Sequence, residues 1–365
     1  MRMRKLRFSF SVGGPIASSV VEEGVEAERL GYDFVWVADH LSDIPPITAV
    51  FDAWTVLSYV GARTKRIMLA PGVTDIQRMH PAKMANVVAT LDNLTGGRAV
   101  LGIGAGEVMN VVPYGMEWEA AGARVDRLRE FLKVVQLLWG SSYLEPVDFD
   151  GNYYRLKRAH LGLSPVQKPR PPIYIGAFAS PLMLGLVGEI ADGWFPGAFY
   201  TPQSFAERTK IIREAAEKSG RTMREIDAIV NLPVAIGKNA ALRRRAKEKL
   251  RRQLVLNKYM LRILGAEEAY EKVSRELQYQ LIPPSVDYEK VLEKAVRELP
   301  IADDVLEKGV TEMMALGTVD ECVSSIERFV KAGATHVHLS TVVSKMEECR
   351  AVARLILPHL RERGR

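Results

Sequence analysis

The stretch LGIGAGEVMN, from Leu101 to Asn110, ends an apolar run in alternating glycines and one carboxylate. Its glycines follow a G-x-G-x-G pattern, whereas a dinucleotide-binding turn needs G-x-x-G spacing for its last glycine and a helix directly behind it. Alternating glycines at the carboxyl end of a strand leave one backbone face bare, so that a flat ring could lie there while Glu107 points into the same space. A tight strand exit with a solvated glutamate is the simpler alternative.

Short apolar runs alternate with longer amphipathic ones on both sides of this stretch, which predicts βαβ units and a parallel sheet. Eight such units in one chain of 365 residues favour a closed (β/α)8 TIM barrel over an open sheet. The predicted strands are LRFSFSV at 6–12, DFVWVAD at 33–39, RIMLAPGV at 66–73, AVLGIG at 99–104, PPIYIGA at 171–177, DGWFPGA at 192–198, IDAIVNLPVAI at 226–236 and THVHLST at 335–341.

Two segments fall outside this repeat. VDFDGNYYRL at 147–156 has an Asp-Gly pair and alternating aromatic residues, which is typical of a β-hairpin. Residues 239–316 are too long for one crossover connection and are rich in charge, so we expect a helical insertion that caps the barrel or contacts another subunit. Because the eighth strand follows this insertion, we interpret residues 1–365 as a single barrel domain.

The charge and the apolar segments of the sequence argue against nucleic acid and membranes as partners of the protein. Much of the net charge of +6 comes from ALRRRAKEKLRRQ at 241–253, a basic segment typical of a solvated helix face. No aromatic residues interleave its charges, which argues against nucleic-acid binding. No segment approaches the roughly 18–20 apolar residues of a membrane span.

The number and spacing of the cysteines indicate the cellular compartment and whether a disulfide or a metal site is expected. Only Cys322 and Cys349 occur, without a C-x-x-C motif, so we expect a cytoplasmic protein without a disulfide framework or a metal site. A homodimer is the default expectation for a soluble enzyme.

Chemistry in such a barrel lies at the carboxyl ends of the strands. Most residues at the predicted ends are small, and only His40 and Glu107 are strong candidates for proton transfer. His40 could merely bond to its own loop, but its place just after a strand and beside Asp39 favours a functional role. We expect at most one of His336 and His338, which alternate within a strand, to face the barrel interior.

Several stretches together resemble the bacterial-luciferase-like superfamily, and within it the oxidoreductases that depend on the deazaflavin coenzyme F420. They are ADH at 38–40, APGVTD at 70–75, TLDNLTGGRAVLGIGAGEVMN at 90–110, VDFDGNYYRL, PPIYIGA and LGTVDE at 316–321. The chain is most similar to the sugar-phosphate and alcohol dehydrogenase branch. PPIYIGA followed by EIADGW is shared with methylenetetrahydromethanopterin reductases. The resemblance spans nearly the whole chain and is least clear around 240–316.

The resemblance implies a coenzyme pocket at the carboxyl end of the barrel, with a non-proline cis peptide between Gly72 and Val73 behind the ring. His40 would act as the base toward a substrate hydroxyl, and Glu107 would stand near the ring nitrogen that gains a proton on reduction. The coenzyme phosphate would meet backbone N–H groups ahead of the helix near Pro181, where the helix dipole favours an anion. The implied cofactor-binding residues are Asp39, Gly72, Val73, Thr74, Gly106, Asn110, Gly176, Ala177, Phe178 and Ala179.

The resemblance leaves the substrate open. The dehydrogenases have a tryptophan near the substrate where Ile44 stands here, whereas the reductases have a glutamate at Ser11 and an aspartate at Glu107. An FMN-dependent monooxygenase of the same fold, which would use oxygen, is an alternative to a deazaflavin enzyme, since a deazaflavin transfers hydride and reacts poorly with oxygen. A third interpretation is a barrel that binds a ligand without turnover. The presence of both His40 and Glu107 argues against it.

Overall fold

The computed structural model describes residues 5–42, 49–197, 199–276, 288–298 and 301–362. The strands β1 to β12 span Arg7–Val12, Phe34–Val37, Met68–Pro71, Thr74–Asp75, Leu101–Gly104, Val147–Asp150, Arg155–Ala159, Ile173–Gly176, Gly193–Phe195, Asp227–Ile236, Ala315–Gly317 and His336–Ser340. The helices α1 to α14 span Ala17–Arg29, Ala53–Arg63, Pro81–Thr95, Ala121–Gly140, Pro181–Ile190, Pro202–Lys218, Ala240–Leu256, Tyr259–Leu264, Glu267–Glu276, Tyr288–Glu298, Asp303–Met313, Val319–Lys331, Lys345–Leu355 and Leu357–Glu362.

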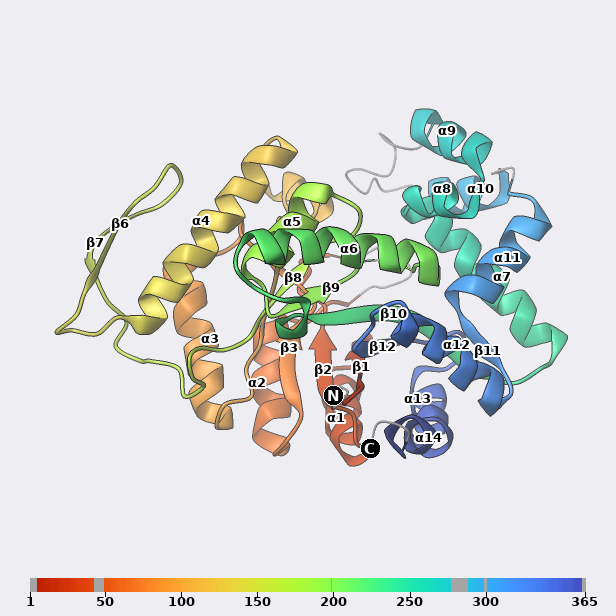
Figure 1. Cartoon of the computed structure of the whole chain (residues 1–365), viewed down its shortest axis with the longest axis horizontal. Coiled ribbons are helices and arrows are strands. Elements are labelled where there is room, and N and C mark those ends of the chain that lie inside the picture. The colour runs from red at the N-terminus through yellow and green to blue at the C-terminus, as the bar shows by residue number, and fades with distance from the viewer. Residues whose placement is uncertain (1–4, 43–48, 198, 277–287, 299–300, 363–365) are drawn as a thin grey trace.

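The central strands form a nearly closed parallel barrel, which confirms the predicted fold (Figure 1). Their order around the sheet is β3-β2-β1-β12-β10-β9-β8-β5-β4, and each of these pairings is parallel. β4 follows β3 almost directly, and a bridge between Leu69 and Ala99 joins β3 to the start of β5. β3 and β4 therefore share one interrupted strand position, and the barrel has the eight positions of a (β/α)8 fold.

The interruption of this strand depends on a glycine of the neighbouring strand. A Cβ atom on Gly102, in β5, would lie 2.0 Å from the carbonyl oxygen of Pro71, at the end of β3. Only a residue without a side chain allows so close an approach of two backbones. The rest of the interior around this contact is filled by large apolar side chains, including Phe34, Trp36 and Tyr174.

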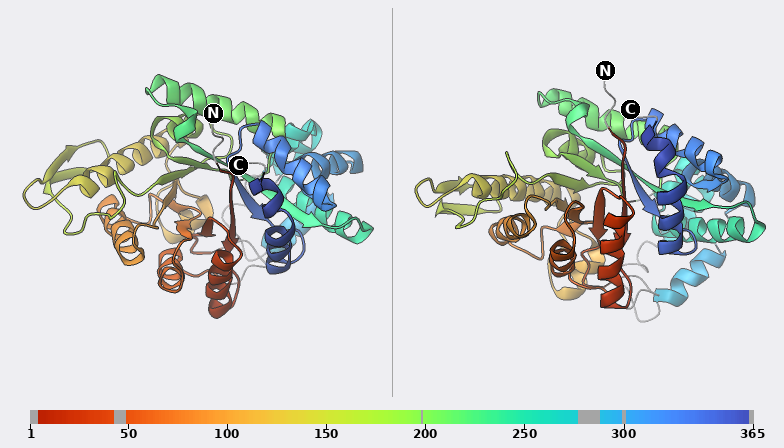
Figure 2. Two further views of the ribbon diagram at one scale, coloured as in Figure 1. Left: turned by 60° about the horizontal axis from the view of Figure 1, so that its bottom comes forward. Right: turned by 90° about the horizontal axis from the view of Figure 1, so that it is seen from below.

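The two segments outside the repeat lie on opposite sides of the barrel (Figures 1 and 2). β6 and β7 form the predicted antiparallel hairpin. The helices α7 to α11 lie between β10 and β12 in the chain and share an apolar cluster of their own, which includes the fully buried Leu250, Leu261 and Met313. The basic segment 241–253 lies within α7, and 315–317 forms β11, which pairs with β10. Residues 277–287 of the predicted insertion lie outside the described residues.

One expectation for the last strand is wrong. His336 and His338 both face the barrel interior, with 0% and 5% of their surface exposed. Residues two apart on a strand point to the same face, so the alternation that suggested opposite faces in fact places both side chains inside. Both rings contact the hydroxyl of Ser9, in the adjacent strand β1.

No helix in the described part of the chain is long and apolar enough to cross a membrane.

The contact between Gly102 and Pro71 predicts a sharp dependence of stability on one methyl group. We expect Gly102→Ala to lower the free energy of unfolding by about 1–3 kcal/mol or more, because two backbones must separate to admit the new Cβ atom. The matched control is Gly122→Ala in α4, where a Cβ atom meets nothing within 4 Å. Urea unfolding followed by circular dichroism measures both, and equal midpoints for the two variants would contradict the role given to Gly102.

Candidate functional site

The predicted site residues lie at the carboxyl ends of four strand positions that are neighbours in the sheet. Asp39 and His40 follow β2, Gly72 and Val73 lie between β3 and β4, and residues 106–110 follow β5. Gly176 ends β8, and residues 177–179 follow it. Thr74 begins β4 and is buried. The order of the strands therefore places these residues on one side of the barrel mouth. Ile44, which stands where similar dehydrogenases have tryptophan, lies outside the described residues.

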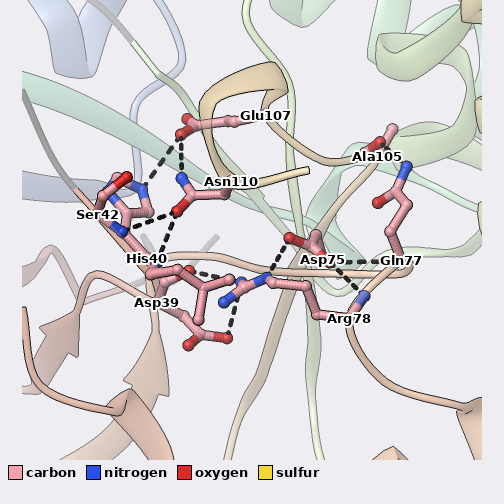
Figure 3. A network of polar contacts seen from close by, with 10 residues as sticks. Asp39, His40, Ser42, Asp75, Gln77, Arg78, Ala105, Glu107 and Asn110 are labelled. Carbon is pink, nitrogen blue, oxygen red and sulfur yellow. Dashed lines mark hydrogen bonds and ion pairs between the residues drawn. The ribbon is translucent and has the colours of Figure 1, made fainter. Parts of the chain in front are cut away.

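His40 and Glu107 are in direct contact (Figure 3). Nε2 of His40 lies 3.3 Å from Oε2 of Glu107, and the two side chains are 17% and 60% exposed. The imidazole is thus sheltered by the barrel mouth, whereas the carboxylate is open to solvent. A carboxylate at this distance stabilises the positive charge that an imidazole gains on accepting a proton. The two predicted proton-transfer groups form one pair.

Asn110 connects the loops that carry this pair. Its side chain is buried, and its Oδ1 accepts hydrogen bonds from the backbone N–H groups of Leu41 at 2.7 Å and Ser42 at 3.3 Å. Its Nδ2 donates to Oε2 of Glu107 at 3.5 Å. Within this structure the carboxamide, predicted as cofactor-binding, holds the loop after β2 against the turn after β5.

Arg78 fixes the backbone in front of His40, and sequence reasoning missed it. Its Nη2 donates to the backbone carbonyl of Asp39 at 2.6 Å and lies 3.2 Å from the Asp39 carboxylate. Its Nε donates to Asp75 at 2.6 Å. Burial opposes the charge of Arg78, but the two carboxylates outweigh that effect and raise the pKa of the guanidinium. Arg78, Asp39 and Asp75 together form a clamp on the backbone before His40. The carboxylate of Asp39 belongs to this clamp, because it is paired with Arg78.

A second missed residue, Gln77, supports the glycine turn after β5. Its Nε2 donates to the carbonyl of Ala105 at 3.0 Å. Gly106 has a φ of 94°, and a Cβ atom there would lie 2.5 Å from Oε1 of Gln77. Both the backbone conformation and the space therefore require glycine at this position. Gln77 and Arg78 follow the quoted stretch APGVTD, but nothing in their spacing identifies the partners they meet across strands.

The peptide between Gly72 and Val73 is cis, as predicted. The Val73 side chain lies over two glycines: Cβ atoms added to Gly104 and Gly176 would come within 3.1 Å and 2.8 Å of its Cγ2. Gly102 in turn faces the Pro71 carbonyl. The interpretation that a ring lies against bare glycine backbone is therefore corrected, because these glycines admit neighbouring protein atoms and Val73 provides an apolar floor.

The segment 176–179 is largely engaged in the protein's own hydrogen bonds. The N–H of Ala177 donates to the carbonyl of Phe195 at 3.1 Å, and the carbonyls of Ala177 and Phe178 accept from Trp194 and Tyr200. The Ala177 N–H is therefore not available as the predicted phosphate donor. The segment does lead into α5, as expected, where Ser180 caps the helix through the N–H of Met183 at 3.4 Å.

The residues present suit a flat organic ring with one polar edge. Val73 gives an apolar surface that is partly exposed, and His40 with Glu107 gives a polar pair at the neighbouring strand ends. No group of three or more histidine, cysteine or carboxylate side chains that could hold a metal ion occurs among the described residues. A separate cavity of about 820 Å³, lined by Arg7, Phe34 and Tyr174 among others, lies at the opposite, amino-terminal end of the strands.

Comparisons with known proteins place this chain in a family and identify proteins of the same fold. A model of the luciferase-like monooxygenase family matches residues 9–336. The F420-dependent glucose-6-phosphate dehydrogenase of Microbacterium testaceum is 31% identical, over 98% of this chain and 98% of that protein. A phthiodiolone/phenolphthiodiolone dimycocerosates ketoreductase of a Mycobacterium species is 34% identical, over 64% of this chain and 67% of its own length. The coenzyme F420-dependent tetrahydromethanopterin reductase of Methanopyrus kandleri shares the fold, with a TM-score of 0.79 at 23% identity over 98% and 99% of the two chains.

The clamp predicts that lysine cannot replace Arg78. We expect Arg78→Lys to lower the free energy of unfolding by about 1–3 kcal/mol, because an ammonium group cannot reach two carboxylates and a carbonyl in the geometry of a guanidinium. Arg350→Lys, at the more exposed pair with Glu26, is the control and should change stability little. The urea midpoints of the two variants measure this difference. An Arg78→Lys variant as stable as the Arg350→Lys control would contradict the structural role given to Arg78.

Proposed function

The chain belongs to the luciferase-like monooxygenase family, and on that premise we propose that it is an oxidoreductase that transfers a hydride between coenzyme F420 and an organic substrate. The observation that carries the proposal is the contact between His40 and Glu107, at the same end of the barrel as the apolar floor formed by Val73. The relative from Microbacterium testaceum, which matches over nearly its whole length, is named for F420 dependence. When bound, the deazaflavin supplies a carbon that accepts or gives hydride.

His40 is the base that removes the proton from a substrate hydroxyl during oxidation, and the acid that returns it during reduction. Its ring is sheltered at the mouth, and Asn110 and Arg78 hold the backbone on either side of it. Glu107 stabilises the imidazolium from the solvent side. Gly72, Val73, Thr74 and Gly106 would border the coenzyme ring.

An alcohol or sugar phosphate is the favoured substrate class. Two relatives are named as a glucose-6-phosphate dehydrogenase and a ketoreductase, which supports chemistry between a hydroxyl and a carbonyl, and a base such as His40 suits this exchange. The likeness to the tetrahydromethanopterin reductase is one of fold alone, so reduction of a pterin-bound carbon has less support. We further infer that the protein is cytoplasmic and forms a homodimer; size-exclusion chromatography with light scattering would test the dimer.

Titration with coenzyme F420 and with FMN tests the proposal directly. Trp36 lies beneath the cis peptide, because a Cβ atom on Gly72 would come within 3.3 Å of its ring, so ligand binding should quench tryptophan fluorescence. We expect F420 to bind at micromolar concentration and FMN to bind more weakly. Anaerobic reduction of bound F420 by an alcohol or sugar phosphate should follow as loss of its visible absorbance. Tight binding of FMN with oxygen-dependent turnover would favour the monooxygenase alternative, and binding of neither would remove the proposal.

Replacement of the base should separate chemistry from coenzyme binding. We expect His40→Ala to lower kcat by ~10²–10⁴ while the Kd for coenzyme F420 stays within a few-fold, because the lost group moves a proton and does not hold the coenzyme tail. His160→Ala, at an exposed histidine after the hairpin, is the control. Full turnover of the His40→Ala protein on its true substrate would place the base elsewhere.

A further inference from the structure

The cavity at the amino-terminal end of the barrel carries an excess of positive charge. It has a volume of about 820 Å³ and lies between the starts of β1, β2, β3, β8 and β9 and the last helix, α14. Three carboxylates line it, those of Asp33, Asp192 and Glu225. Six cationic side chains line it as well: Lys5, Arg7, Arg66, Lys168, Arg170 and Arg361. The cavity wall therefore holds twice as many positive as negative side chains.

Two of the three carboxylates are paired with cations of the same wall. Asp33 lies 3.5 Å from Nζ of Lys5 and 3.4 Å from Nη2 of Arg361. Both carboxylate oxygens of Asp192 accept hydrogen bonds from the guanidinium of Arg170. These carboxylates are thus already engaged, and their cations need no further anion.

Two further ion pairs join the wall to the surrounding protein. Oε2 of Glu225 lies 3.5 Å from Nε of Arg221, which lies outside the wall. Nη1 of Arg7 lies 3.2 Å from Oδ2 of the buried Asp227. One pair adds a cation from outside the wall and the other adds a carboxylate, so together they leave the excess of positive charge unchanged.

Arg66 and Lys168 carry most of this excess. Among the residues that the structure describes, neither makes an ion pair with a carboxylate. Nη2 of Arg66 donates to the carbonyl of Glu28 at 3.3 Å, and Nζ of Lys168 donates to the carbonyl of Pro165 at 3.5 Å. A guanidinium has five N–H donors and an ammonium has three, so both groups keep donors for a ligand. Both residues are exposed, which lets an anion reach them from solvent.

A multiply charged phosphate has the chemistry that suits this cavity. A cleft lined mainly by one sign of charge concentrates ions of the opposite sign, and the effect grows with the charge of the ion. Guanidinium groups match the oxygens of a phosphate in geometry as well as in charge. The volume lies within the roughly 300–1,000 Å³ of small-molecule sites and exceeds the size of a monatomic ion. Met68 and Pro169 add apolar surface to the wall.

We propose that this cavity is a binding site for a multiply charged phosphate, either inorganic or carried by a small organic molecule. Arg66 and Lys168 donate hydrogen bonds to the phosphate oxygens, and Arg7, whose side chain is 34% exposed, adds charge from the wall. The inference does not rest on the proposed function, because the cavity lies at the opposite end of the barrel from His40 and Glu107.

Calorimetric titration with pyrophosphate, in a phosphate-free buffer of low ionic strength, tests the site. We expect one pyrophosphate to bind per chain, with a Kd that rises as salt is added. The double variant Arg66→Gln/Lys168→Gln should raise the Kd by about 10-fold or more, because it removes two charge-assisted hydrogen bonds. Its urea midpoint should equal that of the unmodified protein, since neither residue makes an ion pair with a described carboxylate.

The matched control removes the same amount of charge elsewhere. Arg155→Gln/Lys210→Gln replaces two exposed cations of β7 and α6, and its Kd for pyrophosphate should stay within about two-fold of the unmodified value, as expected for screened, distant charges. Absence of saturable binding, or equal Kd values for the two double variants, would overturn the proposal.

ADP distinguishes the two sources of phosphate. If ADP binds more tightly than pyrophosphate, and the Arg66→Gln/Lys168→Gln variant weakens both, the site takes an organic phosphate whose apolar part lies against Met68 and Pro169. If pyrophosphate binds more tightly, with the same dependence on the variant, the site takes the inorganic anion. ADP binding that is unaffected by the variant would place the nucleotide elsewhere and contradict a site for organic phosphates in this cavity.

Discussion

The barrel mouth depends on how closely the Pro71 carbonyl approaches Gly102 in the next strand. Because no side chain separates these backbones, β3 can end against β2 and the chain can resume as β4 against β5. The residues between them, Gly72 and Val73, are thereby turned toward the mouth. Val73 then occupies the space that Gly104 and Gly176 leave open. The apolar floor of the site thus follows from one contact deeper in the barrel.

Most of the fold could be predicted from the sequence, because the eight strand and helix units carry strong periodic patterns and each strand ends in small residues. The pairing of His40 with Glu107 followed only in part: both were assigned to strand exits, but their contact depends on a loop held by Asn110. Arg78 was missed because its contact with Asp39, 39 residues away along the chain, leaves no local pattern, although Asp75 stands only three residues before it. The prediction for His336 and His338 was wrong although the strand itself was recognised, because residues two apart on a strand point to the same face.

The site divides into parts that are fixed and parts that meet solvent. Arg78, Asp39 and Asp75 form a buried cluster that holds the backbone, whereas Glu107 remains mostly exposed. Charged groups that hold structure are therefore sheltered from salt, and the carboxylate beside His40 is not. In the proposed function, protons could therefore exchange with the surrounding water through Glu107 while Arg78 and Asn110 hold the backbone around His40.

The helices α7 to α11 bury their apolar side chains chiefly against one another. Among the described residues, only a few, such as Phe178 and Ile263, touch both this cluster and the main core. The barrel closes through β10 and β12 without them. In evolutionary terms, the length and surface of the insertion could therefore change with little effect on the packing of the barrel that holds His40 and Glu107.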